Sequence, residues 1–270
     1  MLISASIVTY NSSYEEIRNL IDSLTTSMLN KLYIIENSPV SLLKNHLFHS
    51  KIVYIFNPTN PGFGRSHNIA LSESLLQEYD YHFIINPDIH LYPMVISSMV
   101  IRMEADKSIG MMMPRIEFPD GKIQYLPKLL PTPFSLFGRK LKRPKYFNDK
   151  LVNKYELRFV NEKLSYSCPI ISGCFTLLRM SAIKKIGYYD DAYFMYFEDW
   201  DLSRRMHRFY KTMYVPDFFV LHEYNSGANK NIKLFFVFLK SLVIYFNKWG
   251  WFFDKERVIT NKNTLNQFIK

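Results

Sequence analysis

Three acids follow an aromatic run in residues 193–205, which read YFMYFEDWDLSRR. An ionised carboxylate loses solvation against so much aromatic surface unless other groups compensate, so Glu198, Asp199 and Asp201 are candidates for chemistry. Apolar residues then recur at helical spacing, which predicts a helix that begins near Asp199. A structural interpretation makes Asp199 the helix cap and Asp201 a partner of the helix dipole. One capping acid would suffice, so Glu198 or Asp199 is also a candidate general base, and the residues alone leave both interpretations open.

Polar side chains also stand at the ends of apolar segments in the first half of the chain. Short strands are expected at residues 2–10, 31–38, 51–58 and 81–88. Helical patterns lie between them, at about 14–24, 69–79 and 92–105. This alternation predicts an α/β fold with a mostly parallel sheet flanked by helices, in which ligands bind outside the carboxyl ends of the strands. The side chains expected at that edge are Tyr10, Asn11, Glu36, Asn37, Asn57, Asn86 and Asp88. Asn and Asp also terminate strands, but repetition over four strands favours a binding site.

A glycine-containing loop, NPTNPGFGRSHN, occupies residues 57–68 between a strand and a helix. Gly62 and Gly64 would let the backbone approach a ligand closely, and the following helix N-terminus favours an anion. The loop matches neither a dinucleotide fingerprint nor a P-loop. It is consistent with a phosphate-binding loop and equally with a plain turn.

Asp88 and His222 are the candidate metal ligands. Asp88 ends the expected strand at 81–88, where its carboxylate would suit Mg²⁺ or Mn²⁺, hard cations that prefer oxygen. An Asx turn after Pro87 explains the same acid without a metal. His222 follows another strand pattern, and a lone histidine is more often structural than a ligand.

The second half of the chain is less regular. We expect a turn at Asp120–Gly121, a strand at 169–179 and a short helix at 181–186. Residues 138–145, GRKLKRPK, read as a basic loop that contacts phosphate or anionic lipid, or is simply solvated. Cys168 and Cys174 have no metal-ligand spacing, which favours a reduced, cytoplasmic setting. No signal peptide is visible, and the apolar run at 234–246 is shorter than the roughly 20 residues that span a bilayer.

Composition and charge narrow the partners. Of the 270 residues, 48% are hydrophobic and 21% are charged, which excludes a disordered chain. The net charge of +10 favours an anionic partner, either nucleic acid, an acidic membrane surface or a phosphorylated substrate. Nucleic acid is disfavoured, because no binding module is recognisable and the proposed cleft is rich in acids.

Taken in order, these motifs resemble those of a known family. The set is VTYNS (8–12), ENS (36–38), NPGFGRSHN (60–68), INPD (85–88), SGCFTLLR (172–179), GYYDDAYFMYFEDWDLSRR (187–205) and His222. It is similar to family 2 inverting glycosyltransferases, and within them to the bacterial rhamnosyltransferase-like branch. The resemblance implies a GT-A fold over residues 1–225, with a nucleotide-sugar-binding half (1–114) and an acceptor and catalytic half (115–225). Residues 226–270 would form a helical tail rich in aromatic and basic residues.

The resemblance also implies a set of site residues. The donor, a dTDP- or UDP-linked sugar, would be bound by Thr9, Tyr10, Asn11, Glu36, Asn37, Asn60, Gly62, Arg65, Asn68, Asn86 and Asp88. Asp88 and His222 would hold Mg²⁺ or Mn²⁺. Two positions depart from the usual pattern: Glu36 replaces an Asp, and Asn86 leaves one carboxylate for the metal instead of two.

In the chemistry that the resemblance implies, Asp199 is the general base for an acceptor hydroxyl that attacks the anomeric carbon with inversion. Glu198 would orient the acceptor, which Gly173 and Trp200 would also contact, and Asp201 would hold the helix. The product would be a bacterial cell-surface polysaccharide (O-antigen, capsule or cell wall), built on an undecaprenyl-diphosphate-linked acceptor. The rival interpretation is a nucleotide-binding protein of the same fold without transferase activity.

The tail has two interpretations. Residues 231–255 mix large apolar side chains with lysines, as in a helix that lies on an anionic membrane, and equally as in a helix that packs on the domain. The lipid-linked acceptors of the family favour the membrane interpretation. The protein would then be peripheral at the inner face of the plasma membrane.

Overall fold

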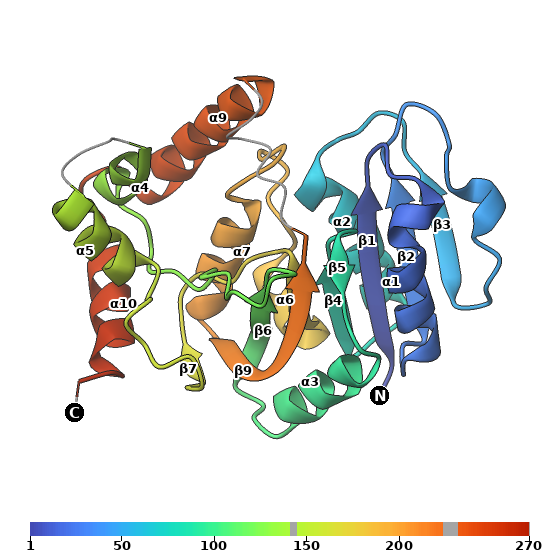
Figure 1. The fold of residues 1–270 in the computed structure, drawn as a ribbon, viewed down its shortest axis with the longest axis horizontal. Coiled ribbons are helices and arrows are strands. Elements are labelled where there is room, and N and C mark those ends of the chain that lie inside the picture. Colours follow the sequence, from blue (N-terminus) through green and yellow to red (C-terminus); the bar gives the residue numbers. More distant parts are fainter. Residues whose placement is uncertain (141–144, 224–231, 270) are drawn as a thin grey trace.

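One mixed sheet forms the centre of the molecule in the computed structural model, which describes residues 1–140, 145–223 and 232–269. Within these residues the sheet has nine strands in the order β3-β2-β1-β4-β8-β6-β9-β5, and β7 pairs with β9. The parallel strands are β1 (Ile3–Thr9), β2 (Lys31–Glu36), β3 (Ile52–Phe56), β4 (Tyr81–Ile85), β6 (Ile109–Glu117) and β9 (Lys211–His222). The antiparallel ones are β5 (Ile89–His90), β7 (Tyr166–Ser167) and β8 (Phe175–Arg179). The α/β fold with a mostly parallel sheet is therefore confirmed (Figure 1).

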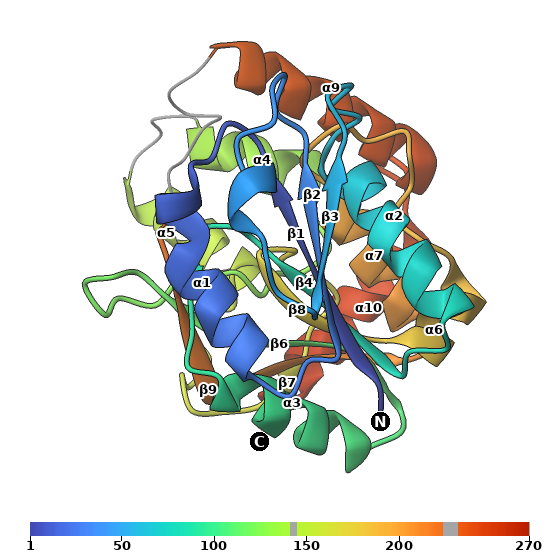
Figure 2. The ribbon, with the colours of Figure 1, turned by 90° about the vertical axis from the view of Figure 1, so that its right-hand side faces the viewer.

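Helices cover both faces of this sheet. The first is α1 (Tyr14–Thr26), which begins with a capping box of Ser13 and Glu16 and buries its apolar stripe on the strands. Figure 2 shows α1 on one side of the sheet and α2 (Phe63–Leu76), α6 (Met180–Ile186) and α7 (Glu198–His207) on the other. The remaining elements are the 3₁₀ helix η1 (Lys44–His46), α3 (Met94–Glu104), α4 (Pro133–Lys140), α5 (Lys145–Tyr155), α9 (Ile232–Trp249) and α10 (Lys255–Asn266).

Two boundaries differ from expectation. The helix expected from residue 69 begins at Phe63, because Gly62 takes a positive φ of 104° that ends the loop and starts the helix early. Residues 138–140 and 145, expected in a basic loop, belong to α4 and α5, and residues 141–144 lie outside the described part. The turn at Asp120–Gly121 is confirmed, with the Phe118 N–H donating to the Lys122 carbonyl at 2.8 Å.

The C-terminal helices belong to the same core as the sheet. Leu242, Tyr245 and Phe246 of α9 are at most 3% exposed and join the main hydrophobic cluster. Part of α9 thus packs on the domain, which was one of the two interpretations of the tail. Within the described residues, no helix is both long enough and apolar enough to cross a membrane.

Candidate active site

Strand pairing brings two distant segments to one edge of the sheet. In the antiparallel pair β4–β8, Ile85 lies opposite Phe175, so the chain leaves β4 where β8 begins. The Asn86 N–H donates to the Cys174 carbonyl at 2.8 Å, which continues the pairing by one step. Residues 86–88 therefore lie beside residues 172–174.

A second pairing brings Asp88 to His222. The two-residue strand β5 pairs with the end of β9, with Ile89 opposite His222, and the Glu223 N–H donates to the Asp88 carbonyl at 3.0 Å. Asp88 Oδ1 then lies 3.2 Å from His222 Nε2. The pair predicted from the sequence as metal ligands is thus juxtaposed by backbone register.

The acids at residues 198 and 199 are presented by an unusual helix start. Tyr196 and Phe197 both adopt left-handed backbone conformations, with φ of 70° and 69°, and α7 begins at Glu198. Phe197 is the capping residue and no side chain caps the helix, so the capping role considered for Asp199 is wrong. Left-handed non-glycine residues are strained, and such strain is concentrated at functional sites.

Backbone donors hold the Asp199 carboxylate. The Gly173 N–H donates to Oδ2 at 3.0 Å and the Trp200 N–H donates to Oδ1 at 2.9 Å. A Cβ at position 173 would lie 3.3 Å from the Asp199 Cβ, so this glycine also makes room for the acid. Gly173, predicted as an acceptor contact, therefore orients the candidate base directly.

One cavity of about 560 Å³ collects these groups. Its walls include Asn86, Asp88, Gly173, Glu198, Asp199, Trp200 and His222, all predicted from the sequence. The aromatic run supplies part of the wall, because Met195, Tyr196 and Phe197 also line the cavity. The cavity is large enough for sugar-sized ligands, whose sites commonly occupy 300–1,000 Å³.

Burial tunes the acids toward proton transfer. Desolvation raises the pKa of Asp199 to about 6, although the hydrogen bonds from Gly173 and Trp200 oppose the shift. Burial, with a smaller contribution from the Asp199 charge, raises the pKa of Glu198 well above its ordinary value. Glu198 is 5% exposed, and its Oε2 has no hydrogen-bond partner among the described residues. With its pKa at about 6, Asp199 is mostly ionised at neutral pH, while burial disfavours the charged form of Glu198; this difference suits Asp199 as the base.

The Cys174 thiol, which lines the same cavity as Asp88 and Asp199, is unreactive. Burial, with smaller contributions from the charges of Asp88 and Asp199, raises the pKa of Cys174 to about 12. Cys168 and Cys174 are both free, as expected for reduced cysteines. A nucleophilic thiol is therefore not part of this site.

The geometry of Asp88 and His222 fits a divalent cation. Two ligands that bind one octahedral cation side by side at about 2.1 Å lie about 3.0 Å apart, close to the observed 3.2 Å. The Asp88 side chain is 36% exposed and opens to the cavity, while His222 is 5% exposed. Among the described residues, no group of three or more His, Cys, Asp or Glu side chains could hold a metal. A cation at this pair would therefore need further oxygen ligands from a substrate.

The residues predicted for the base and ribose lie at the carboxyl ends of β1 and β2. Thr9 is 1% exposed, and its hydroxyl has no partner within the described part of the chain. Tyr10 is 55% exposed, and Asn11 is exposed with a φ of 54°. Asn37 is buried and exchanges hydrogen bonds with Ser66 of α2 at 2.8 and 3.2 Å. The contacts of Thr9, Tyr10, Asn11 and Asn37 with a nucleotide-sugar donor remain predictions.

Glu36 has another role in the structure. Its carboxylate is fully buried and accepts hydrogen bonds from the Leu42 N–H (2.8 Å), the Leu43 N–H (3.3 Å) and the Tyr54 hydroxyl (2.6 Å). The longer acid thus reaches past the strand end and fixes the loop after β2. The contact of Glu36 with the base or ribose remains a prediction.

Gly62 is required by packing, and its approach to a ligand remains a prediction. A Cβ there would lie 2.1 Å from the Phe194 carbonyl oxygen, which accepts from the Phe63 N–H at 2.9 Å. Asn60, just before it, has a φ of 42°. The loop is therefore shaped to meet the segment that leads to the catalytic acids.

Arg65 and Asn68 face a different hollow from Asp199. This second cavity, of about 670 Å³, is also lined by Tyr188 and Asp191. Asn68 donates to the Tyr189 carbonyl and to Asp191, and accepts from the Tyr189 N–H, all at 2.9–3.0 Å. Asn68 therefore connects α2 to residues 189–191, and its contact with the sugar donor, like that of Arg65, remains a prediction.

Several cavity residues were missed by sequence reasoning. Lys128 and Glu156 are buried and form an ion pair at 3.2 Å, and Arg158 binds the other oxygen of Glu156. Gln124 and Phe238 also line the cavity. The one signal in the sequence was a lysine inside the apolar stretch YLPKLLP.

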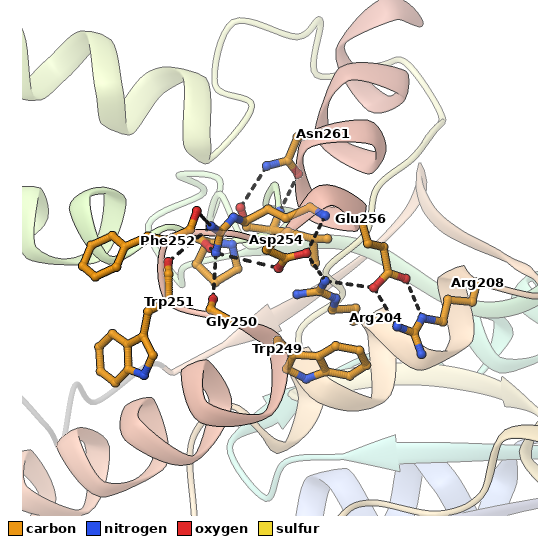
Figure 3. Close-up of polar contacts among 12 residues, drawn as sticks. Arg204, Arg208, Trp249, Gly250, Trp251, Phe252, Asp254, Glu256 and Asn261 are labelled. Atoms are coloured by element: carbon orange, nitrogen blue, oxygen red, sulfur yellow. Dashed lines mark hydrogen bonds and ion pairs between the residues drawn. The ribbon is translucent and has the colours of Figure 1, made fainter.

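Helix α7, which carries the candidate acids, is bound to the C-terminal segment by hydrogen bonds and ion pairs. Asp201, fully buried, accepts from Arg205 Nε (2.8 Å), Trp249 Nε1 (2.9 Å) and Lys248 Nζ (2.8 Å). Figure 3 shows the neighbouring cluster, in which Arg204 NH2 donates to Asp254 Oδ1 at 2.8 Å and to Glu256 at 2.9 Å. Asp201 is thus an anchor between helices rather than only a partner of the dipole.

Comparison with known proteins gives a consistent assignment. The family described as Glycosyl transferase family 2 matches residues 4–187, more than half of the chain. Curated N-acetylglucosaminyl-diphospho-decaprenol L-rhamnosyltransferases from two strains of Mycobacterium tuberculosis are 29% identical over 147 residues, which cover 53% of this chain and 47% of theirs. The chain thus spans about half the length of the curated relatives it matches.

Solved structures share the fold at low identity. GalNAc-T7 with UDP, GalNAc and Mn²⁺ aligns over 84% of this chain and 44% of its own, with a TM-score of 0.62 and 14% identity. S. aureus TarS covers all of this chain and 43% of its own, at 0.59 and 13%. The mannosyltransferase PcManGT from Pyrobaculum calidifontis, with GDP-Man and Mn²⁺, covers 83% and 57%, at 0.54 and 12%. These glycosyltransferase neighbours confirm the expected GT-A fold.

Proposed function

The chain belongs to glycosyl transferase family 2, and on that premise we propose that it is an inverting glycosyltransferase. It transfers rhamnose or another hexose from a dTDP- or UDP-linked donor to a saccharide acceptor in bacterial cell-surface polysaccharide synthesis. The observation that carries the proposal is the meeting of Asp199, Asp88 and His222 in one cavity. A base and a candidate metal pair on the walls of one sugar-sized space are what glycosyl transfer with inversion needs.

The proposed reaction is a single displacement. The Asp199 carboxylate takes the proton of an acceptor hydroxyl while that oxygen forms a bond to the anomeric carbon. The bond from that carbon to the donor phosphate breaks at the same time, and its electron pair leaves with the nucleoside diphosphate. The hydrogen bonds from Gly173 and Trp200 hold the Asp199 carboxylate in place, and Glu198, which lines the same cavity, would orient the acceptor.

A divalent cation, Mg²⁺ or Mn²⁺, is part of the proposal. Asp88 and His222 would hold it, and when bound it would neutralise the charge that develops on the leaving diphosphate. The fit of their 3.2 Å separation supports this, as do the Mn²⁺ ions of two structural neighbours. Thr9, Tyr10, Asn11 and Asn37 remain the proposed contacts of base and ribose.

The proposed acceptor is lipid-linked, and the protein works at a membrane surface. The curated relatives are named for a diphospho-decaprenol acceptor, and the geometry of α9 supports a similar arrangement here. Phe238 of α9 lines the cavity, while Phe236 on the same helix is 63% exposed and Phe253 beyond it is 98% exposed. Helix α9 therefore connects the acceptor cavity to an apolar surface. We place the protein at the cytoplasmic face of the plasma membrane, bound peripherally to anionic lipid.

A donor screen followed by turnover tests the enzymatic part. UDP-, dTDP- and GDP-sugars are screened for thermal stabilisation with and without Mn²⁺, and the best donor is then assayed for transfer in wild type and in Asp199→Asn. We expect transfer to fall by 10²–10⁴-fold in the variant while donor binding changes little. Near-normal turnover in Asp199→Asn refutes the assigned base. Nucleotide binding without any turnover in the wild type would favour the alternative, a nucleotide-binding protein of this fold without transferase activity.

Flotation with liposomes tests the membrane part. Deleting the tail is uninformative, because it would remove the core residues of α9 and expose the apolar surface that they cover. Phe236→Ser combined with Phe253→Ser should reduce binding to vesicles that contain anionic lipid. Phe48→Ser is the matched control, since Phe48 is 84% exposed and follows η1 in the donor half. Equal flotation of all three proteins would reject this surface.

A further inference from the structure

We propose that Gln124 is a positioning residue that fixes the tautomer of His222 and so presents the Nε2 lone pair to a cation. The role of Gln124 toward the imidazole rests on hydrogen-bond geometry alone. The role of the cation rests on the proposed function. The residue lies in the loop after β6, at the end of the expected turn around Asp120–Gly121, and no functional role was expected for it from the sequence.

The orientation of the Gln124 amide is determined by its donors. The side chain is 6% exposed, and its Nε2 donates to the His222 carbonyl at 2.9 Å and points at the Glu117 carbonyl at 3.5 Å. A flipped amide would place Oε1 against these two carbonyl oxygens, with acceptors facing acceptors. Oε1 must therefore face the His222 ring, where it lies 3.0 Å from Nδ1.

This contact dictates where the ring proton sits. An amide oxygen can only accept, so Nδ1 carries the hydrogen and donates it to Gln124 Oε1. In the neutral ring the lone pair is then on Nε2. That atom faces Asp88 Oδ1 at 3.2 Å and Asn86 Nδ2 at 3.5 Å.

In this tautomer Nε2 and Asp88 Oδ1 can both donate an electron pair to one cation, and without a cation the donor that faces Nε2 is the Asn86 amide. With the opposite tautomer, Nε2–H would donate to Asp88 and close the pair with a hydrogen bond that a metal must first break. Gln124 prevents this and keeps both ligand atoms directed at the same point. Partners that orient a metal-binding histidine in this way commonly change metal affinity by about 10–100-fold.

The backbone holds Gln124 firmly enough for this role. Its N–H donates to the Ile116 carbonyl at 2.8 Å, and Glu117 bridges to Ile123 across the turn that contains Gly121. The loop that carries Gln124 also supplies Ile123 and Tyr125 to the cavity wall. The geometry of the candidate metal pair is therefore set from the acceptor half of the chain.

The test reads the tautomer before any metal is added. Protein with ¹⁵N-labelled histidine is recorded at about pH 8.5, two units above the ordinary histidine pKa, with long-range ¹H–¹⁵N correlation. The His222 signal is identified by its absence in His222→Asn. Wild type should carry the proton on Nδ1. Gln124→Met, which keeps the bulk and loses the amide, should shift the ring toward Nε2–H and weaken Mn²⁺ binding by about 10–100-fold in calorimetry.

Gln77→Met is the control, since Gln77 is exposed at the end of α2. Thermal unfolding and circular dichroism confirm that each variant is folded. A wild type with the proton on Nε2, or a Gln124→Met protein with an unchanged tautomer, overturns the proposal. A protein with the expected tautomer, and its loss in Gln124→Met, but no Mn²⁺ binding, upholds the role of Gln124 and overturns the metal site of the proposed function.

Discussion

Replacing Asp254 should destabilise the whole protein, because this acid compensates a buried arginine on the catalytic helix. Arg204 is 2% exposed and Asp254 is 3% exposed at the side chain, and their atoms lie 2.8 Å apart (Figure 3). The same Asp254 oxygen accepts the Arg257 N–H at 2.9 Å and so caps α10. Asp254→Ala removes the more deeply buried partner of this charge and a helix cap together, and it leaves Arg204 with Glu256, whose side chain is 32% exposed, as its remaining acid.

The expected magnitude follows from these two contacts. Breaking a buried pair from one side destabilises by about 3–5 kcal/mol, and loss of a cap adds about 1 kcal/mol. We therefore expect Asp254→Ala to lower the free energy of unfolding by about 4–6 kcal/mol. Asp254→Asn keeps an oxygen for both donors and loses only the charge. Since charge-assisted hydrogen bonds are roughly twice as strong as neutral ones, about half of the loss should remain.

Urea unfolding, followed by circular dichroism and tryptophan fluorescence, measures both values. The design also asks whether residues 232–269 unfold with the rest. One transition that shifts for both probes supports a single cooperative unit. A loss below about 1 kcal/mol in Asp254→Ala refutes the reasoning, and so does a separate early transition with an unchanged main one. If Asp254→Ala does not fold, Asp254→Asn still supplies the measurement.

Three further outcomes are expected. Asp199 must be ionised to act as a base, and burial raises its pKa to about 6. We therefore expect kcat/KM to fall tenfold for each pH unit below about 6. An acidic limb near pH 4 would contradict this. Gly62→Ala should lower the free energy of unfolding by more than about 3 kcal/mol, because its Cβ would lie 2.1 Å from the Phe194 carbonyl oxygen. Gly121→Ala should lower it by only about 1 kcal/mol, the cost of a positive φ, because nothing lies within 4 Å of its Cβ. Equal losses in urea unfolding would refute the steric account. Mn²⁺ at 100 times its Kd should raise Tm by about 5 °C or more in wild type and not in Asp88→Asn, measured by differential scanning fluorimetry; an unchanged rise in the variant would remove Asp88 from the site.

The strands and the first helix of residues 3–85 could be predicted, because short apolar runs and a capping box are local signals in the sequence. Short apolar runs ending in polar residues gave the strands near 3–9, 31–36, 52–56 and 81–85, and the capping box at Ser13 gave the start of α1. The order of the strands was out of reach. Inserting β8 between β4 and β6 depends on pairings between residues 65 to 98 positions apart, which no local pattern encodes.

In the candidate site too, the residues with a local signal could be predicted and those that depend on distant partners could not. Asp88, Asp199 and His222 stand at strand ends or a helix start, so their positions could be inferred, although the resemblance was needed to assign their roles. Gln124 could not be found, because its function depends on a partner 98 residues away. The loop-binding role of Glu36 could not be foreseen, since an acid at a strand end looks the same in the sequence whether it meets a ligand or a loop.

The catalytic acid and the C-terminal helices depend on each other energetically. Raising the pKa of Asp199 from 3.8 to about 6 disfavours its ionised form in the folded protein by about 3 kcal/mol at neutral pH. The left-handed conformations of Tyr196 and Phe197 add strain of about 1–2 kcal/mol each. Such a segment persists only when its surroundings hold it in place.

The surroundings that hold this segment come largely from α9. The ring of Phe197 lies 5.2 Å from Phe238 and 5.5 Å from Tyr245, and Asp201 bonds to Trp249 at the end of the same helix. If these contacts loosened, water would reach Asp199 and its pKa would fall toward the ordinary value. The base would then be weaker while the protein remained folded. A substitution in α9 at a residue that does not line the cavity, such as Tyr245, should therefore lower kcat and move the acidic limb of the pH profile to lower pH. A simple loss of stability does not produce both effects.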